Sequence, residues 1–222
     1  MHASLATAFP LADFTRPGDA YLRLVHPLRG RDELLSLGEE TLCFDLETLG
    51  FVGRPIFLVG FLVVEGGVPS VVQLLACDYT EEESILSAYA EEAARRPLWG
   101  SFNGKSFDLP SLRRRCAYYG LKLPEPREHR DLLFPARKVY RGVLPNCRLK
   151  TLESRVFGHH RSHDLEGGEI PPAYHAFVRT GAPGDLLRIL LHNREDLVTL
   201  ARLWLHLEEP EPGLDARLPE ES

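Results

Sequence analysis

The sequence predicts an α/β fold in which helices flank a mixed β-sheet and the elements follow the order βββαβαβα. Three runs rich in β-branched, aromatic or leucine residues come first, at 42–47, 56–64 and 68–77. Helical and strand patterns then alternate from residue 80, and leucines at helical spacing close the pattern at 184–207. We therefore expect three strands, then helices and strands in alternation, in one domain of this 222-residue chain.

Residues that favour turns bound the first three strands. The acidic pair Glu39 and Glu40 precedes the first strand, Gly50 follows it, and residues 65–67 join the second and third strands into a hairpin. The helix predicted at 80–96 begins with a threonine and three glutamates, whose charge complements the positive end of the helix dipole.

The rest of the pattern completes the domain. The remaining predicted elements are a strand at 97–102, a helix at 108–119, a strand at 129–133, and helices at 148–157, 172–179 and 184–207. Residues 1–40 suit a short strand and helix appended to this core, 41–207 form the domain itself, and 208–222 form an acidic, proline-bearing tail. We expect the tail to be mobile.

Composition argues against disorder and against a membrane span. Hydrophobic residues make up 44% and charged residues 26% of the chain, as in soluble globular proteins. The longest apolar run, 55–64, is about half the length that a membrane-spanning helix needs, and the N-terminus lacks the pattern of an export signal. The four cysteines are far apart and form no C-x-x-C pair. We expect a cytoplasmic protein with no membrane partner.

Basic charge is concentrated in one part of a chain whose net charge is −6. Residues 113–161 contain 13 Lys and Arg against 4 Asp and Glu, a local balance of +9. This stretch is either a solvated surface or a face that follows phosphates. Nearby aromatic residues could stack on bases or belong to the core; they are Phe107, Tyr118, Tyr119, Phe134 and Tyr140.

The first candidate site residues are two carboxylates in FDLET. Hydrolysis of a phosphodiester bond needs an activated water and cations beside the phosphate, and two divalent metal ions about 4 Å apart supply both. Such ions bind oxygen ligands, so carboxylates from different elements must converge. Asp45 and Glu47 project from one face of a strand expected to be interior. Burying both without a cation is costly, so a metal ion or basic partners are expected.

Two further carboxylates have an ordinary structural explanation beside a functional one. Asp108 follows residues 103–105 and opens a helix with Pro110 in its first turn, which is also a routine helix start. His192 and Asp196 are four residues apart on the last helix and stack on one face, where they form either a surface pair or part of a site. Taken together with FDLET, these carboxylates favour a site.

Three motifs in this order match a known family. FDLET, FNGKSFDLP and HNREDL resemble the three exonuclease motifs of the DEDD group, in the YprB-type subgroup of predicted RNase H-like 3′–5′ exonucleases. The resemblance runs from about Leu42 to Leu207 and includes the HRDLL and RLKTLE stretches. It implies an RNase H-like fold and a metal-dependent nuclease that hydrolyses phosphodiester bonds of single-stranded nucleic acid.

The resemblance also implies roles for the four carboxylates. Asp45 would bridge two divalent cations, Mg²⁺ or Mn²⁺. Glu47 and Asp196 would complete the shell of one cation, and Asp108 would hold the other through water. His192 departs from the pattern, because one DEDD branch has a Tyr four residues before the last Asp and the other has a His five before it. This sequence has a His in the Tyr register, and we hypothesise that His192 orients or deprotonates the attacking water.

Three more residues are candidates for substrate binding. Asn103 resembles the motif asparagine and would bind the substrate backbone or orient a ligand, although a turn asparagine explains it equally well. Lys105 would meet a phosphate. Asp131, in HRDLL, lies at a predicted strand end as a supporting or substrate residue. The crowded histidines at 159, 160 and 163 are read as a loop rather than as a transition-metal site.

Two rival functions fit the same fold. One is a nucleic-acid-binding module whose metal site is inactive, and the other is an endonuclease or junction resolvase. DNA and RNA substrates are not separated, because no residue that reads a 2′-hydroxyl is evident. Relatives sometimes carry a helical repeat domain after the nuclease and this sequence ends without one, so we expect a partner protein to help deliver substrate.

Overall fold

The computed structural model describes residues 7–10, 12–161 and 165–208, and its described strands form one mixed sheet. The strand order is β1-β2-β5-β4-β3-β6-β7. At its centre β3 (Thr41–Thr48), β4 (Ile56–Glu65) and β5 (Val68–Leu75) pair antiparallel, while β6 (Leu98–Ser101) and β7 (Glu128–Asp131) continue parallel to β3. The predicted α/β fold with a mixed sheet in the order βββαβαβα is thus confirmed.

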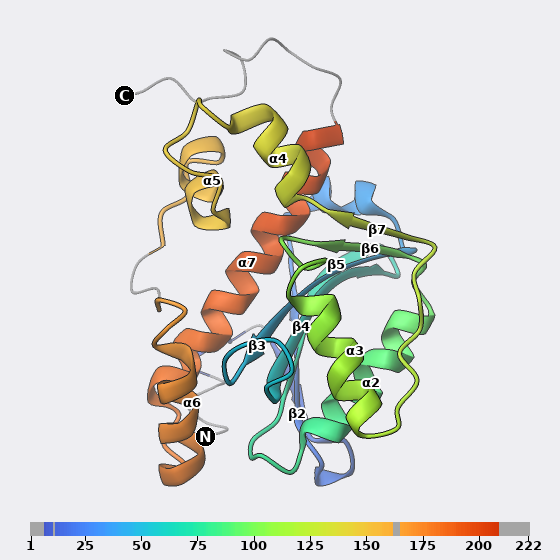
Figure 1. The fold of residues 1–222 in the computed structure, drawn as a ribbon, viewed down its shortest axis with the longest axis vertical. Coiled ribbons are helices and arrows are strands. Elements are labelled where there is room, and N and C mark those ends of the chain that lie inside the picture. Colours follow the sequence, from blue (N-terminus) through green and yellow to red (C-terminus); the bar gives the residue numbers. More distant parts are fainter. Residues whose placement is uncertain (1–6, 11, 162–164, 209–222) are drawn as a thin grey trace.

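Helices cover both faces of the sheet (Figure 1). The helices α2 (Glu82–Ala94) and α3 (Asp108–Tyr118) lie on one face, where α2 packs on β4 and β5. The 25-residue helix α7 (Gly184–Glu208) crosses the other face and contacts β3, β4, β5 and β6. The shorter helices α4 (Leu133–Tyr140) and α5 (Leu149–Val156) lie at one end of α7, and α6 (Ile170–Thr180) lies at the other (Figure 1).

The alternation of side chains along β3 assigns its residues to the two faces. Leu42, Phe44 and Leu46 belong to the apolar core that includes residues of α2 and α3. Cys43 belongs to a second core that includes Leu197, Leu200 and Leu203 of α7. Because side chains alternate along a strand, Asp45 and Glu47 share the face of Cys43 and point toward α7. The strand pattern thereby determines which helix the two acids meet.

The first forty residues differ in part from the expected strand and helix. Between residues 12 and 40 the structure has two strands, β1 (Asp13–Thr15) and β2 (Leu22–Pro27), and two short 3₁₀ helices, η1 (Pro17–Asp19) and η2 (Asp32–Leu37). Strand β2 pairs with β5 over six residues and so extends the central sheet. This segment is therefore continuous with the sheet rather than appended to it, because the edge of β5 offers unpaired backbone groups. Residues 209–222 of the predicted tail lie outside the described residues.

Helix α4 is an element that the sequence pattern does not predict. Its segment, LFPARKVY, has a proline at the third helical position and aromatic and β-branched residues that favour strands. A proline is tolerated in the first turn because the amide that it lacks has no partner within the helix.

No helix in the described part of the chain is long and apolar enough to cross a membrane. All four cysteines are free thiols.

Candidate active site

The candidate site lies where β3 faces the middle of α7. Strand β3 presents Asp45 and Glu47, and α7 presents His192 and Asp196 one helical turn apart. His192 Nε2 lies 3.4 Å from Asp196 Oδ2 and 4.0 Å from Glu47 Oε1. Glu47 is buried, whereas Asp45, His192 and Asp196 are partly exposed. One histidine thus stands between carboxylates of the strand and of the helix.

Asp108 joins this cluster from the opposite face of the sheet. It is the first residue of α3, it is 6% exposed, and its carboxylate interacts with its own backbone amide and with that of Leu46. The contact with Leu46 ties the start of α3 to β3 beside the two acids of FDLET. The expected helix start and the expected place in the site therefore coexist in this residue.

The carboxylates perturb one another. Burial raises the pKa of Asp45 well above its ordinary value, and the charges of Asp196 and Asp108 raise it further. Burial also raises the pKa of Asp108 to about 7, partly offset by its backbone hydrogen bonds, and Asp131 and Asp196 act in the same direction as burial. Among the described residues, neither Asp45 nor Asp108 forms an ion pair with a lysine or arginine. The cluster therefore gathers acids whose ionisation is unfavourable until a cation or another basic partner offsets their charge.

A buried chain of polar side chains holds Asp45. Asn193 Nδ2 donates to Asp45 Oδ2 at 2.9 Å, and Asn193 Oδ1 accepts from Gln73 Nε2 at 2.8 Å. Gln73 Nε2 also donates to the carbonyl of Leu190, so Gln73 Oε1 is the acceptor toward His26 Nε2 at 2.9 Å. Burial is the main reason that the pKa of His26 is lowered to about 4, and the nearby charge of Arg194 lowers the pKa as well. A neutral His26 thus ends a chain that fixes one oxygen of Asp45.

Arg161 contacts the other side of the cluster. Its guanidinium donates to Asp196 Oδ1 at 2.5 Å and to Glu153 Oε2 at 2.6 Å, and it lies 3.2 Å from Glu195 Oε2. The arginine side chain is 1% exposed, and Glu153 also accepts from Thr199 of α7 at 2.8 Å. This network links α5 to α7 and engages one oxygen of Asp196.

The turn between β6 and α3 carries the candidate substrate residues. Asn103 has a φ of 63°, a left-handed conformation that asparagine tolerates, and both Asn103 and Lys105 are exposed. Gly104 packs so closely on Ser101 that a Cβ would overlap that side chain. Residues of this turn are thus held rigidly at the edge of the carboxylate cluster.

Asp131 supports this turn from β7. Its Oδ1 accepts from the amides of Asn103 and Leu133 at 2.7 and 3.2 Å, and its Oδ2 accepts from the amide of Lys105 at 3.0 Å. It is only 5% exposed. Of the two roles that the sequence leaves open for Asp131, this geometry favours the supporting role over substrate contact, because backbone amides already engage both oxygens. The loop histidines His159 and His160 are exposed, and residue 163 lies outside the described residues.

Comparison with known proteins decides the family. A model of the RNase H superfamily matches residues 42–208, which include the carboxylate cluster. The chain belongs to the RNase H superfamily. A relative 30% identical over 171 residues is "Uncharacterized protein YprB" of Bacillus subtilis (strain 168), and the match covers 75% of this chain and 41% of the relative. The chain therefore carries a YprB-type RNase H-like domain and spans less than half the length of that relative.

A solved structure is similar to this chain in fold at low sequence identity. The family B DNA polymerase from the hyperthermophilic archaeon Pyrobaculum calidifontis aligns with a TM-score of 0.57 and 13% identity, over 75% of this chain and 24% of the polymerase. At that identity the likeness establishes the fold alone. The fold is nonetheless of a nuclease type, because RNase H-like proteins are generally nucleic-acid hydrolases.

The donor atoms of this RNase H-like site suit divalent cations. RNase H-like nucleases typically use divalent metal ions, which prefer carboxylate oxygens, and Asp45 and Asp108 are close acids without a basic partner among the described residues. As they stand, no three His, Cys, Asp or Glu side chains within the described ranges are arranged to hold an ion. Arg161 also engages one oxygen of Asp196, which is then not available to a cation.

Sequence reasoning missed the residues that support the site. Asn193, Gln73 and His26 come from α7, β5 and β2, and no motif connects them. In the sequence, Arg161 is only one member of a basic stretch. In the structure, its side chain is among the most buried arginine side chains of the described residues. The only signal available was Asn193 itself, a polar residue within the apolar pattern of α7 next to His192.

Proposed function

We propose that this protein is a metal-dependent nuclease, a 3′–5′ exonuclease of the DEDD type that hydrolyses phosphodiester bonds in single-stranded DNA or RNA. The observation that carries the proposal is the convergence of Asp108 and Asp196 on Asp45 from two faces of the sheet. Glu47 belongs to the same cluster, because His192 lies between it and Asp196. Residues so distant in sequence have no structural need to meet, and the mutual repulsion of their carboxylates opposes folding. A function that uses them together explains why they do.

The four carboxylates would hold two divalent cations, Mg²⁺ or Mn²⁺. When bound, the cations lower the pKa of a water molecule and stabilise negative charge on the phosphate and on the leaving oxygen. Asp45 has neighbours on both sides, since Asp196 and Asp108 are its largest charge partners. It is therefore the residue best placed to be shared between two cations, and Asn193 holds it in that orientation.

His192 would accept the proton of the attacking water. Its Nε2 faces the gap between Asp196 and Glu47, at the edge of the carboxylate cluster. Imidazole accepts a proton near neutral pH, and the adjacent carboxylates stabilise the imidazolium that forms. Asn103 and Lys105, exposed on the turn that Asp131 holds, would contact the phosphodiester backbone next to the bond that is cut.

The test is a degradation assay that compares the wild type with Asp45→Asn. The wild type should shorten end-labelled single strands in Mg²⁺ or Mn²⁺, and the variant should lose this activity while its melting temperature is not lowered. A circular single strand should resist an exonuclease but not an endonuclease or resolvase. Activity of Asp45→Asn equal to that of the wild type would contradict the proposed site.

The pairing of Arg161 with Asp196 favours one alternative, a nucleic-acid-binding module whose metal site is inactive. In such a binding module, the guanidinium of Arg161 would permanently occupy the place of a metal ion beside Asp196. Isothermal titration with Mn²⁺ separates the two functions, because the nuclease should bind the ion through carboxylates that Asp45→Asn weakens. A binding module should bind single strands without binding Mn²⁺ at this cluster.

A further inference from the structure

The basic charge of residues 113–161 is mostly neutralised, except over α4 and α5. Arg113, Arg115, Arg127 and Arg130 each pair with a glutamate, and Arg161 contacts three acids. Residues 132–152 differ, because they contain five Lys or Arg and no Asp or Glu. Acidic partners therefore compensate the named arginines outside this segment, whereas the segment itself contains basic charge without acidic residues.

Four basic residues of this segment are available to a partner. Arg137 and Lys138 lie in the last turn of α4, Arg141 follows it, and Arg148 precedes α5. All four are exposed, and none forms an ion pair within the part of the chain that the structure describes. Like charges gathered without counterions repel one another, which is unfavourable unless an anion binds there.

A hollow of about 430 Å³ lies in this surface, lined in part by Arg137, Arg141 and Asn146. The side-chain oxygen of Asn146 accepts from the amide of Arg148 at 3.0 Å and from the hydroxyl of Thr151 at 2.7 Å. The side-chain NH₂ group of Asn146 keeps two donor hydrogens. Together with the guanidinium groups of Arg137 and Arg141, these hydrogens supply hydrogen-bond donors to the hollow. Donors without acidic neighbours suit the oxygens of a phosphate.

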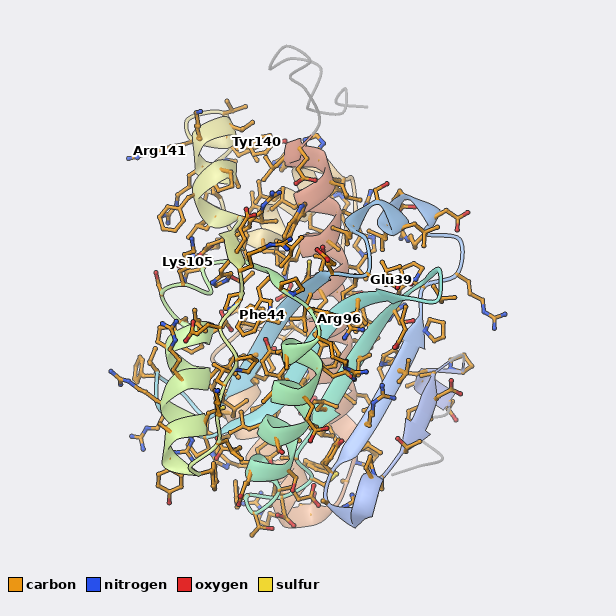
Figure 2. The ribbon with its side chains drawn as sticks, turned by 90° about the vertical axis from the view of Figure 1, so that its right-hand side faces the viewer. Glu39, Phe44, Arg96, Lys105, Tyr140 and Arg141 are labelled. Atoms are coloured by element: carbon orange, nitrogen blue, oxygen red, sulfur yellow. The ribbon has the colours of Figure 1, made fainter. Side chains whose placement is uncertain are left out.

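Contacts at both ends hold α4 in place. The amide of Leu133 donates to Asp131, which also holds the turn of Asn103 and Lys105. At the other end Tyr140 is 1% exposed and its hydroxyl lies 2.6 Å from His206 Nε2 of α7. Figure 2 shows Arg141 and Lys105 along the same side of the molecule, with Arg141 projecting outward. The basic surface is thus built onto the element that leaves the candidate site.

We propose that the α4–α5 surface, namely Arg137, Arg141 and Asn146 with Phe134, is a second subsite that binds the backbone of a single nucleic-acid strand whose end lies at the carboxylates. Phe134, in the first turn of α4, is 55% exposed and offers a ring on which a base stacks. The eight residues of α4 extend about 12 Å. At about 3.4 Å per phosphate of a stacked strand, the length of α4 corresponds to about four nucleotides.

The experiment measures binding of fluorescent oligothymidines to the full chain, in EDTA so that no strand is cut, over a range of salt concentrations. The test variant is Arg137→Ala/Arg141→Ala. The matched control, Arg29→Ala/Arg179→Ala, removes two exposed arginines that line neither this hollow nor the carboxylate cluster. Both variants should keep the wild-type melting temperature, because exposed arginines without partners contribute little to stability.

The test variant should bind a long oligothymidine more weakly, and its plot of log K against log salt concentration should be less steep by about 1.4, for two lost phosphate contacts. The control should match the wild type. Equal slopes for the test variant and the wild type, or lost binding to anionic vesicles with unchanged oligonucleotide binding, would overturn the subsite.

The proposed subsite rests on the proposed function in one respect only, namely that the end of the bound nucleic-acid strand lies at the carboxylates. A degradation assay in Mn²⁺ on the same proteins therefore separates two failures. Salt slopes that differ without any hydrolysis by the wild type would refute the nuclease and keep the subsite. Hydrolysis with unchanged slopes would refute the subsite alone.

Discussion

At the scale of single residues, Gly60 decides how closely Asn193 approaches Asp45. Gly60 is the register partner of Asp45 on β4, and a Cβ at this position would overlap the Asn193 carboxamide. The missing side chain therefore leaves room for the hydrogen bond that orients the acid. Backbone flexibility has no part in this, because Gly60 has an ordinary strand conformation.

We expect Gly60→Ala to destabilise the fold by about 1–3 kcal/mol, the usual cost of adding a methyl group to a packed interior. It should also lower nuclease activity, because Asn193 moves away from Asp45. Thermal denaturation and the rate on a labelled single strand measure the two effects. Gly167→Ala is the control, since its added Cβ meets nothing within 4 Å and its φ is ordinary. A Gly60→Ala protein with wild-type stability would show that this close approach is not required.

His192 is the residue that gives the proposed chemistry its proton acceptor. We expect His192→Ala to lower kcat by about 10²–10⁴-fold, the usual contribution of a general base. Binding of Mn²⁺ should change far less than kcat, because the carboxylates remain. The matched control is His175→Ala, an exposed histidine on α6 that contacts Tyr79. An unchanged rate in His192→Ala would rule out the assigned role.

At the scale of elements, the site depends on how α5 is tied to α7. Arg161 and Glu153 connect the end of α5 to Asp196 and Thr199 in the middle of α7. An arginine that is 1% exposed and contacts three acids is costly to remove, because the acids then remain close together without their cation. The same contact competes with any cation for Asp196.

We expect Arg161→Met to lower the free energy of unfolding by about 3–5 kcal/mol, as when one partner of a buried ion pair is removed. Chemical denaturation measures the loss, and the exposed Arg137→Met should change stability by less than about 0.5 kcal/mol. Added Mn²⁺ should stabilise Arg161→Met more than the wild type, because Asp196 is released from its partner. Equal stabilisation by Mn²⁺ would show that the arginine and the ion do not compete.

At the scale of the whole molecule, the carboxylate cluster makes stability depend on pH and on cations. The pKa of Asp108 is raised from 3.8 to about 7, so the folded protein holds a proton that the unfolded chain has released. Its contribution to stability is present below pH 3.8 and is lost as the pH rises through about 7. Divalent cations bind the deprotonated acids and should reverse that loss.

We therefore expect the stability of the metal-free wild type to fall relative to that of Asp108→Asn between about pH 4 and pH 7. This comparison cancels the buried histidines, whose low pKa values affect both proteins equally. Mn²⁺ should raise the melting temperature more at pH 8 than at pH 5, because protons displace it at the lower pH. An Mn²⁺ effect that is the same at both pH values would contradict binding at these acids.

The sequence by itself determined the order of strands and helices from β3 to α7 and the three motifs that meet at the site. Periodicity and turn residues are local properties, so they identified β3, β4, β5, α3 and α7 to within a few residues. Helix α4 was missed because its proline and aromatic residues contradict local propensity, and the contacts at Asp131 and His206 stabilise it instead.

Only the tertiary structure decided which residues support the acids. The chain from His26 through Gln73 to Asn193, the close approach at Gly60 and the burial of Arg161 each join residues far apart in sequence. The unpaired charge of α4 and α5 became visible only when Arg113, Arg115, Arg127 and Arg130 of the basic stretch were found to have acidic partners. Side-chain pairing depends on distances in space, and a sequence pattern records only neighbours along the chain.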